Sequence, residues 1–213
     1  MAENQDSPRP DAINRFLDFL KESELSCESN GPMNKKTFVC IDAVKAHLAA
    51  RGAEKLKDIL DALFEGKDTP DCGTILSSDA SYVAVLCVLL KINKGRSIGG
   101  FIRRDLSDNF LRPHRESRPK ELPDGISYEE FRAAQWMFNV PPFTKAMIRD
   151  FDKEIILPIT KKTFRGRGGS AEIYEIQIHA CCNKFHGDIQ GNARKMCYQN
   201  LVMNCLLLYS ARY

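Results

Sequence analysis

The chain has 213 residues, enough for one domain or two small ones, and its 43% hydrophobic and 28% charged residues are typical of a globular protein with a buried core. Its 31 Lys and Arg residues exceed its 28 Asp and Glu residues by a formal charge of +3, which is too small an excess to indicate a nucleic-acid partner. With only 13 Gly and 10 Pro residues, the sequence is neither collagen-like nor of low complexity.

Neither a secretion signal nor a membrane span is evident in the sequence. Residues 1–12 are polar and acidic, and they lack the basic and apolar segments of a signal peptide. The most apolar stretches, 82–90 and 201–209, have about half the length that a spanning helix requires. We therefore expect a cytoplasmic or nuclear protein without a membrane partner, in which the eight cysteines are reduced thiols.

The first two thirds of the chain have the apolar periodicity of helices. The segments with this pattern are 13–20, 44–48, 56–64 and 83–90. Gly52 and Gly66 are suited to end the second and third helices, and Ser78 is a candidate cap for the fourth. Because apolar residues nearly surround the fourth helix, we expect it to be buried.

Segment 112–125 interrupts this pattern with three prolines and many charges, which predicts a linker-like loop. After it, Ser127-x-x-Glu130 has the form of a capping box and predicts the start of another helix. The prolines at 141 and 142 end that helix. We therefore expect a helical N-terminal region over 1–142.

From about residue 155 the period changes to that of a strand. In the segment 171–179, Tyr174, Ile176 and Ile178 alternate with residues on the opposite face, and 159–164 is a plausible partner strand. The glycine-rich segment 165–170 between them has the composition of a turn. The sequence thus predicts an α+β fold, with a mostly α-helical region followed by a glycine-turned antiparallel β-hairpin in a second region, 155–213.

The glycine-rich turn is the motif that carries chemistry. Three glycines within 166–169 let backbone N–H groups approach an anion closely. A P-loop requires Gly-Lys-Ser/Thr at the start of a helix, and a Rossmann turn also leads into a helix, whereas a strand follows here. A glycine loop between two strands is instead the arrangement of protein kinases, in which it covers the phosphates of ATP.

The segment Gly-Arg-Gly-Gly-Ser-Ala-Glu-Ile-Tyr at 166–174 is similar to the kinase motif G-x-G-x-x-G-x-V-Y. Ala171 replaces the third glycine, and Ile173 replaces the valine that packs over the adenine. Upstream, Trp136 and the segments 101–111, 141–143 and 157–159 resemble the helical N-terminal extension of filamentous-fungal kinase-like proteins. The chain thus resembles the N-terminal part of the eukaryotic protein kinase-like family, and its hairpin the start of a kinase N-lobe.

This resemblance implies ATP-dependent phosphoryl transfer to protein Ser/Thr hydroxyls as the family function, with ATP and Mg²⁺ as cofactors. Lys195 is included because 193–195 has the A-x-K form of the lysine strand. The residues to which the resemblance assigns ATP binding are Gly166, Arg167, Gly168, Gly169, Ser170, Ala171, Ile173 and Lys195.

The catalytic motifs of the family are missing from this chain. It contains no Asp-Phe-Gly, and Arg104-Asp105-Leu106 precedes the glycine loop instead of following it. We therefore expect a truncated kinase-like protein without catalytic residues or phosphoryl transfer of its own. The alternative is that the helical region is a protein-interaction or regulatory module without catalysis, and protein partners would bind there.

The candidate residues also have simpler interpretations. The glycines fit an ordinary hairpin, Lys195 fits a solvated lysine, and a solvated turn explains the basic cluster of Lys161, Lys162, Arg165 and Arg167 as well as a phosphate-attracting surface does. A second group, formed by His179, Cys181, Cys182, His186 and Cys197, contains zinc-ligand residue types. Because adjacent cysteines diverge along a strand, we expect no metal site there.

Overall fold

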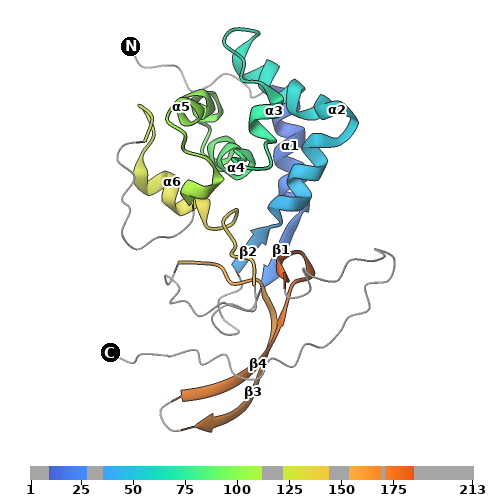
Figure 1. Ribbon diagram of the computed structural model, residues 1–213, viewed down its shortest axis with the longest axis vertical. Helices are drawn as coiled ribbons and strands as arrows, with labels where there is room; N and C mark the ends of the chain where they lie inside the picture. The colour runs from blue at the N-terminus through green and yellow to red at the C-terminus, as the bar shows by residue number, and fades with distance from the viewer. Residues whose placement is uncertain (1–9, 28–35, 112–121, 144–153, 169–170, 185–213) are drawn as a thin grey trace.

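Helices occupy one end of the molecule and a long β-hairpin the other (Figure 1). The computed structural model describes residues 10–27, 36–111, 122–143, 154–168 and 171–184. The helices are α1 (Asp11–Glu22), α2 (Ile41–Phe64), α3 (Cys72–Ile75), α4 (Val83–Lys91), α5 (Ile98–Arg103) and α6 (Tyr128–Gln135), and the strands are β1 (Glu24–Cys27), β2 (Lys36–Val39), β3 (Ile159–Gly168) and β4 (Ala171–Ile178). The predicted α+β fold class is confirmed. No helix in these residues is both long enough and apolar enough to cross a membrane.

The core of the helical part is built around α4. All eight residues from Val83 to Leu90 are buried, as their nearly continuous apolar character predicts. Helices α1, α2, α5 and α6 all contact α4. The apolar faces of α1 and α2 therefore pack against this central helix, and their buried residues belong with those of α4 to the main hydrophobic cluster.

The start of α4 differs from the prediction. Ser78 does not cap the helix, which begins at Val83. Its first turn is instead capped from a distant residue, because the Val85 N–H donates to the Asp108 carboxylate at 2.9 Å. The Asp108 N–H in turn donates to the Ser81 carbonyl at 2.7 Å. A 3₁₀ turn, η2 (Asp108–Leu111), holds this carboxylate in place.

Helix α2 is broken where glycine was expected to end it. Arg51, Gly52 and Ala53 have positive φ angles of 51°, 70° and 65°, so the helix stops and restarts within this segment. The second half ends at Glu65 and Gly66, where φ is 53° and 75°. Both predicted stops are confirmed. The predicted cap of α6 is also present, since the Ser127 hydroxyl accepts from the Glu130 N–H at 3.4 Å.

The sequence does not predict the short antiparallel pair β1–β2, because the apolar pattern over 1–142 is that of helices. Glu24 pairs with Val39 and Cys27 with Lys36. Two of the three buried side chains of this pair, Cys27 and Phe38, form a second cluster with Ile156 and Cys182. The third, Val39, belongs to the main cluster. Residues on both sides of the expected boundary between 1–142 and 155–213 therefore share one small core, and the division into two regions stays a prediction.

Strands β3 and β4 form the predicted hairpin, with Phe164 opposite Tyr174 and Gly168 opposite Ala171. Strand β3 is longer than the sequence predicts, because residues 165–168, whose composition is that of a turn, continue the strand. Only residues 169–170 connect the strands, and these lie outside the described residues. So do residues 112–121 of the predicted linker and all of 185–213.

Candidate functional site

The hairpin end places the predicted ATP-binding residues in register across two strands. Gly166 lies opposite Ile173, and Gly168 lies opposite Ala171. Between them, the backbone of Arg167 lies opposite that of Glu172. The residues that the structure brings together are Gly166, Arg167, Gly168, Ala171 and Ile173. Gly169, Ser170 and Lys195 lie outside the described residues.

Gly166 has open space beside it. A Cβ atom built at this position would meet no atom within 4 Å, and the residue is not in the left-handed region of φ. Neither crowding nor backbone conformation among the described residues therefore requires glycine here. A glycine that the local fold does not require is compatible with a ligand that approaches the backbone closely.

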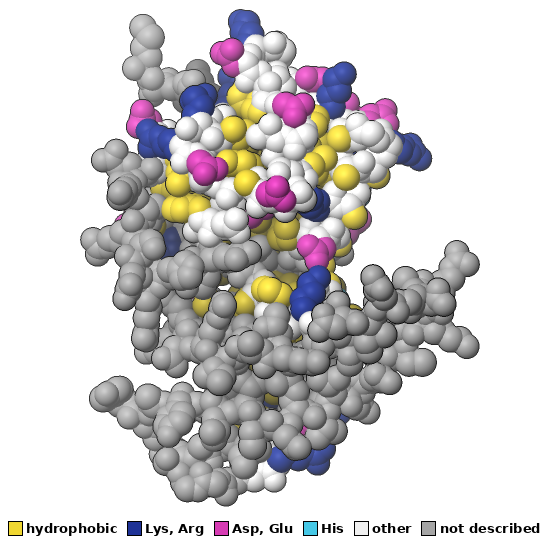
Figure 2. Space-filling model, in the orientation of Figure 1, with side chains coloured by type: hydrophobic (Ala, Val, Ile, Leu, Met, Phe, Trp, Pro, Cys, Tyr) yellow, Lys and Arg dark blue, Asp and Glu magenta, His cyan; other side chains and the backbone are white. Residues whose placement is uncertain are grey.

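Two of the basic side chains around the hairpin, Arg165 and Lys162, have local partners. The Arg165 guanidinium forms an ion pair with Glu175 on the neighbouring strand, and the Lys162 Nζ lies 4.0 Å from the centre of the Tyr174 ring. Figure 2 shows basic side chains at this end of the molecule, whereas acidic and basic side chains alternate over the helical part. Part of the positive charge that would attract a phosphate is thus already balanced by Glu175.

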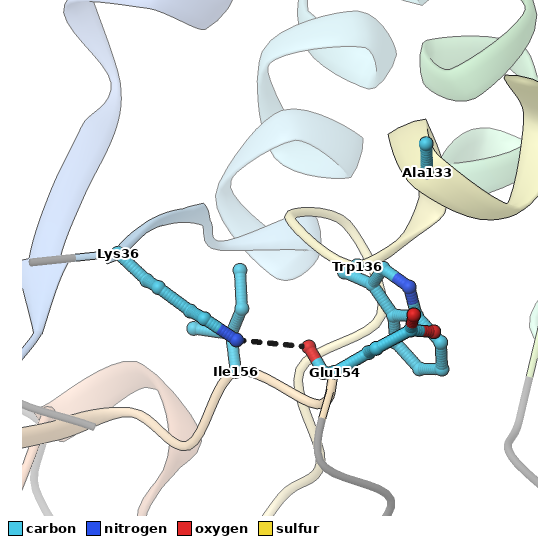
Figure 3. A pocket seen from close by; sticks show the side chains of 5 residues that line it. All are labelled: Lys36, Ala133, Trp136, Glu154 and Ile156. Atoms are coloured by element: carbon cyan, nitrogen blue, oxygen red, sulfur yellow. Dashed lines mark hydrogen bonds between the residues drawn. The ribbon is translucent and has the colours of Figure 1, made fainter. Parts of the chain in front are cut away.

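A hollow of about 330 Å³ opens beside Trp136, at the junction of the helical part with the segment that leads into β3. Its lining residues are Lys36, Ala133, Trp136, Glu154 and Ile156 (Figure 3). The Lys36 Nζ donates to the Glu154 carbonyl at 3.4 Å, and the Glu154 carboxylate lies 2.8 Å from Arg132. No motif in the sequence indicates this hollow, although the single tryptophan of the chain is a signal for it.

Thiols and one imidazole gather where the chain leaves β4. In the 3₁₀ turn η3 (Ala180–Cys182), the Cys181 Sγ lies 3.5 Å from the Cys182 Sγ and 3.0 Å from the His179 Nδ1. The thiol of Cys40, the residue that precedes α2, lies close enough to the Cys181 thiol for each to shift the pKa of the other.

Burial and the neighbouring thiol and carboxylate groups keep these thiols protonated. Burial is the largest cause that raises the pKa of Cys40, to about 11, and Cys181 and Asp42 add to it. The hydrogen bond to Cys182 is the largest cause that raises the pKa of Cys181. A thiol whose pKa is raised is mostly uncharged at neutral pH and is therefore a slow nucleophile. Within the described residues, no three His, Cys, Asp or Glu side chains are arranged to hold a metal ion, and His186 and Cys197 lie outside that part.

Comparisons of the chain with family models, with curated proteins and with solved structures found no match. The kinase-like interpretation accordingly depends on the residues of the glycine segment and on the geometry of its hairpin.

Proposed function

We propose that this chain is a protein kinase-like protein, made of a helical extension and the opening hairpin of an N-lobe, that transfers no phosphoryl group by itself. The observation that supports the kinase-like part is the register of β3 and β4. Because Gly168 pairs with Ala171, the glycine segment joins two antiparallel strands and does not lead into a helix. This excludes the P-loop and Rossmann arrangements for the same glycines.

The residues present suit the phosphates of ATP better than they suit Mg²⁺. Gly166 leaves room for a phosphate against the backbone. Proteins usually hold Mg²⁺ through one or two carboxylates together with substrate phosphates, and the Glu175 carboxylate of the hairpin is engaged by Arg165. The described residues contain no cluster of metal-ligand side chains elsewhere. The chain is therefore suited to weak contact with a polyphosphate and not to its activation.

We expect no transfer of labelled phosphate from Mg-ATP to a generic protein substrate above background, because the metal-binding and catalytic motifs are missing from this chain. Calorimetric titration should show the same weak, roughly millimolar affinity for ATP and for tripolyphosphate. Gly168→Asp should weaken that affinity at least about fivefold, because it places a carboxylate at the glycine segment.

The matched control is Ala46→Asp, which adds the same charge at an exposed position of α2. Equal weakening by both variants would show a general charge effect and would contradict a phosphate site at the hairpin. Phosphorylation of the substrate that Gly168→Asp abolishes would show that the chain is a complete enzyme.

A second candidate function, a protein-interaction module, is favoured by the hollow beside Trp136. A half-buried tryptophan next to Ile156, with Lys36 and Glu154 at the rim, has the composition of a small protein-binding site. A partner there would contact the helical part and the strand segment together.

This candidate can be tested with a photo-crosslinking amino acid at position 133, inside the hollow, and at the exposed position 46 as control. We expect one discrete adduct in cells from position 133, lost in Trp136→Ala, and none from position 46. The same adducts from both positions, or adducts that persist in Trp136→Ala, would exclude the hollow as the binding site.

A further inference from the structure

Two thiols from distant parts of the chain meet at the start of α2. Cys40 immediately precedes this helix, and Cys181 lies in η3 after β4. The two thiols lie close enough together for each to shift the pKa of the other. Both side chains are half-buried, so a small solute can reach them.

Contacts made by neighbouring residues hold the segments that carry Cys40 and Cys181 close together. The Lys184 Nζ lies 3.0 Å from the Asp42 carboxylate, and the Phe143 N–H donates to the Cys182 carbonyl at 2.8 Å. The ring of His179 meets the Phe38 ring edge-on, with 5.8 Å between their centres. The ring contact therefore holds the segment 179–184 beside the end of β2, and the ion pair holds it beside the start of α2. The backbone hydrogen bond joins the same segment to Phe143.

We propose that Cys40 and Cys181 are an oxidation site, where a disulfide forms by exchange with a low-molecular-weight disulfide such as glutathione disulfide. One thiol loses its proton and attacks a glutathione sulfur, which forms a mixed disulfide and releases one glutathione thiolate. The other thiol then loses its proton and attacks the protein sulfur of the mixed disulfide, which releases the second glutathione. Two protein thiols are thus oxidised, and one glutathione disulfide is reduced to two thiols.

The other described thiols near this site are less suitable partners. Cys182 has its Sγ only 3.5 Å from that of Cys181, but a bond between adjacent cysteines would close a small ring around a planar peptide bond. Cys182 is also only 8% exposed. Cys27 is 2% exposed, and its thiol donates to the Lys36 carbonyl at 3.1 Å. Cys40 and Cys181 lie close to each other, and both are exposed enough for a small disulfide to reach them.

The protonated state of both thiols determines how fast the disulfide forms and how stable it is. Exchange is slow at neutral pH, because the thiolate is the attacking species and burial disfavours it. In dithiols of low pKa, ionisation stabilises the reduced form, so their disulfides are strong oxidants. The thiols of Cys40 and Cys181 stay protonated, so ionisation gives their reduced form little stabilisation. The disulfide is therefore slow to form and stable once formed.

The experiment uses the full chain equilibrated at pH 8 in glutathione buffers of increasing oxidised fraction, followed by alkylation, tryptic digestion and mass spectrometry without reduction. We expect a cross-link between the peptides 37–45 and 168–184, which contain Cys40 and Cys181. It should be lost in Cys40→Ser and in Cys181→Ser. It should persist in Cys182→Ser, which separates the two cysteines of the second peptide, and in Cys72→Ser, a matched control at a half-buried cysteine in α3.

The melting temperature of each variant is measured alongside the cross-link, to show that the variants are folded. Oxidation should raise the Tm of the wild-type chain by about 5–10 °C, because the bond closes a long loop. It should leave the Tm of Cys40→Ser unchanged, while the reduced forms of both proteins melt cooperatively. Four outcomes would each overturn the proposal. Two concern the wrong partner: a cross-link that disappears only in Cys182→Ser, or a disulfide to Cys197 or Cys205. The other two are glutathione attached to Cys40 without a cross-link, and no oxidation in any of the buffers.

Discussion

Replacing Leu86 by alanine is expected to lower the free energy of unfolding by about 2–5 kcal/mol, the usual cost of such a cavity in a well-packed core. Leu86 lies in the middle of α4 and has no exposed surface. Helices pack around α4 from several directions, so the neighbours have little freedom to close the space. Since a domain of this size is stable by about 5–15 kcal/mol, this single change removes a large part of the total.

The measurement is urea unfolding followed by circular dichroism, with the midpoint and the slope compared between variants. Leu17→Ala is the matched control, because Leu17 is only half-buried on α1 and the same atoms are removed. We expect a clearly smaller loss for Leu17→Ala. Equal losses for both variants would mean that α4 is not the centre of the core.

Replacing Asp108 by alanine should cost about 1–3 kcal/mol, because it leaves the Val85 N–H at the buried start of α4 without its acceptor. The carboxylate accepts a hydrogen bond from this N–H at 2.9 Å, and Tyr82 at the cap position provides no side-chain hydrogen bond. Asp108→Asn keeps one acceptor oxygen and should cost less than Asp108→Ala.

The pH dependence separates the charge of Asp108 from its role as an acceptor. Burial raises the pKa of this carboxyl above its ordinary value of 3.8, against the hydrogen bonds from Val85, Ser81, Ala84 and Val83, which lower it. The folded state thus holds the proton more tightly than the unfolded state, so ionisation costs stability as the pH rises from 3.8 through the folded pKa.

Urea unfolding of wild type and Asp108→Asn at several pH values from 3 to 7 measures this dependence. Relative to wild type, Asp108→Asn should gain stability as the pH rises through this range, because it has no charge to bury. A difference that stays constant with pH would show that the carboxylate is not desolvated.

The sequence was sufficient to predict features that depend on neighbouring residues. The continuous apolar run of α4, the stop at Gly52 and the Ser127 cap are all local patterns, and each is present. The hairpin was predicted for the same reason, although glycine-rich composition suggested a longer turn than the structure has. Strand pairing extends to Gly168 because the backbone can complete its hydrogen bonds there.

Features that depend on distant residues were missed. Strands β1 and β2 are four residues each, too short for alternation to stand out from the helical pattern around them. The Asp108 cap lies 23 positions from the amide that it accepts from, and no local motif indicates it. At the candidate site, the glycines were predicted together, but neither the hollow beside Trp136 nor the meeting of Cys40 with Cys181 follows from spacing, because each depends on tertiary packing.

The cluster of Cys27 and Phe38 with Ile156 and Cys182 has a consequence for the order in which the chain folds during synthesis. Residues 27 and 38 are made early, whereas their apolar partners follow more than a hundred residues later. At about 5–20 residues per second, β1 and β2 wait roughly 7–30 seconds on the ribosome before Cys182 is added. During this interval the Phe38 side chain, fully buried in the finished protein, lacks part of its cover. The nascent chain therefore exposes apolar surface at this point, which makes β1–β2 the expected binding site for a chaperone during translation.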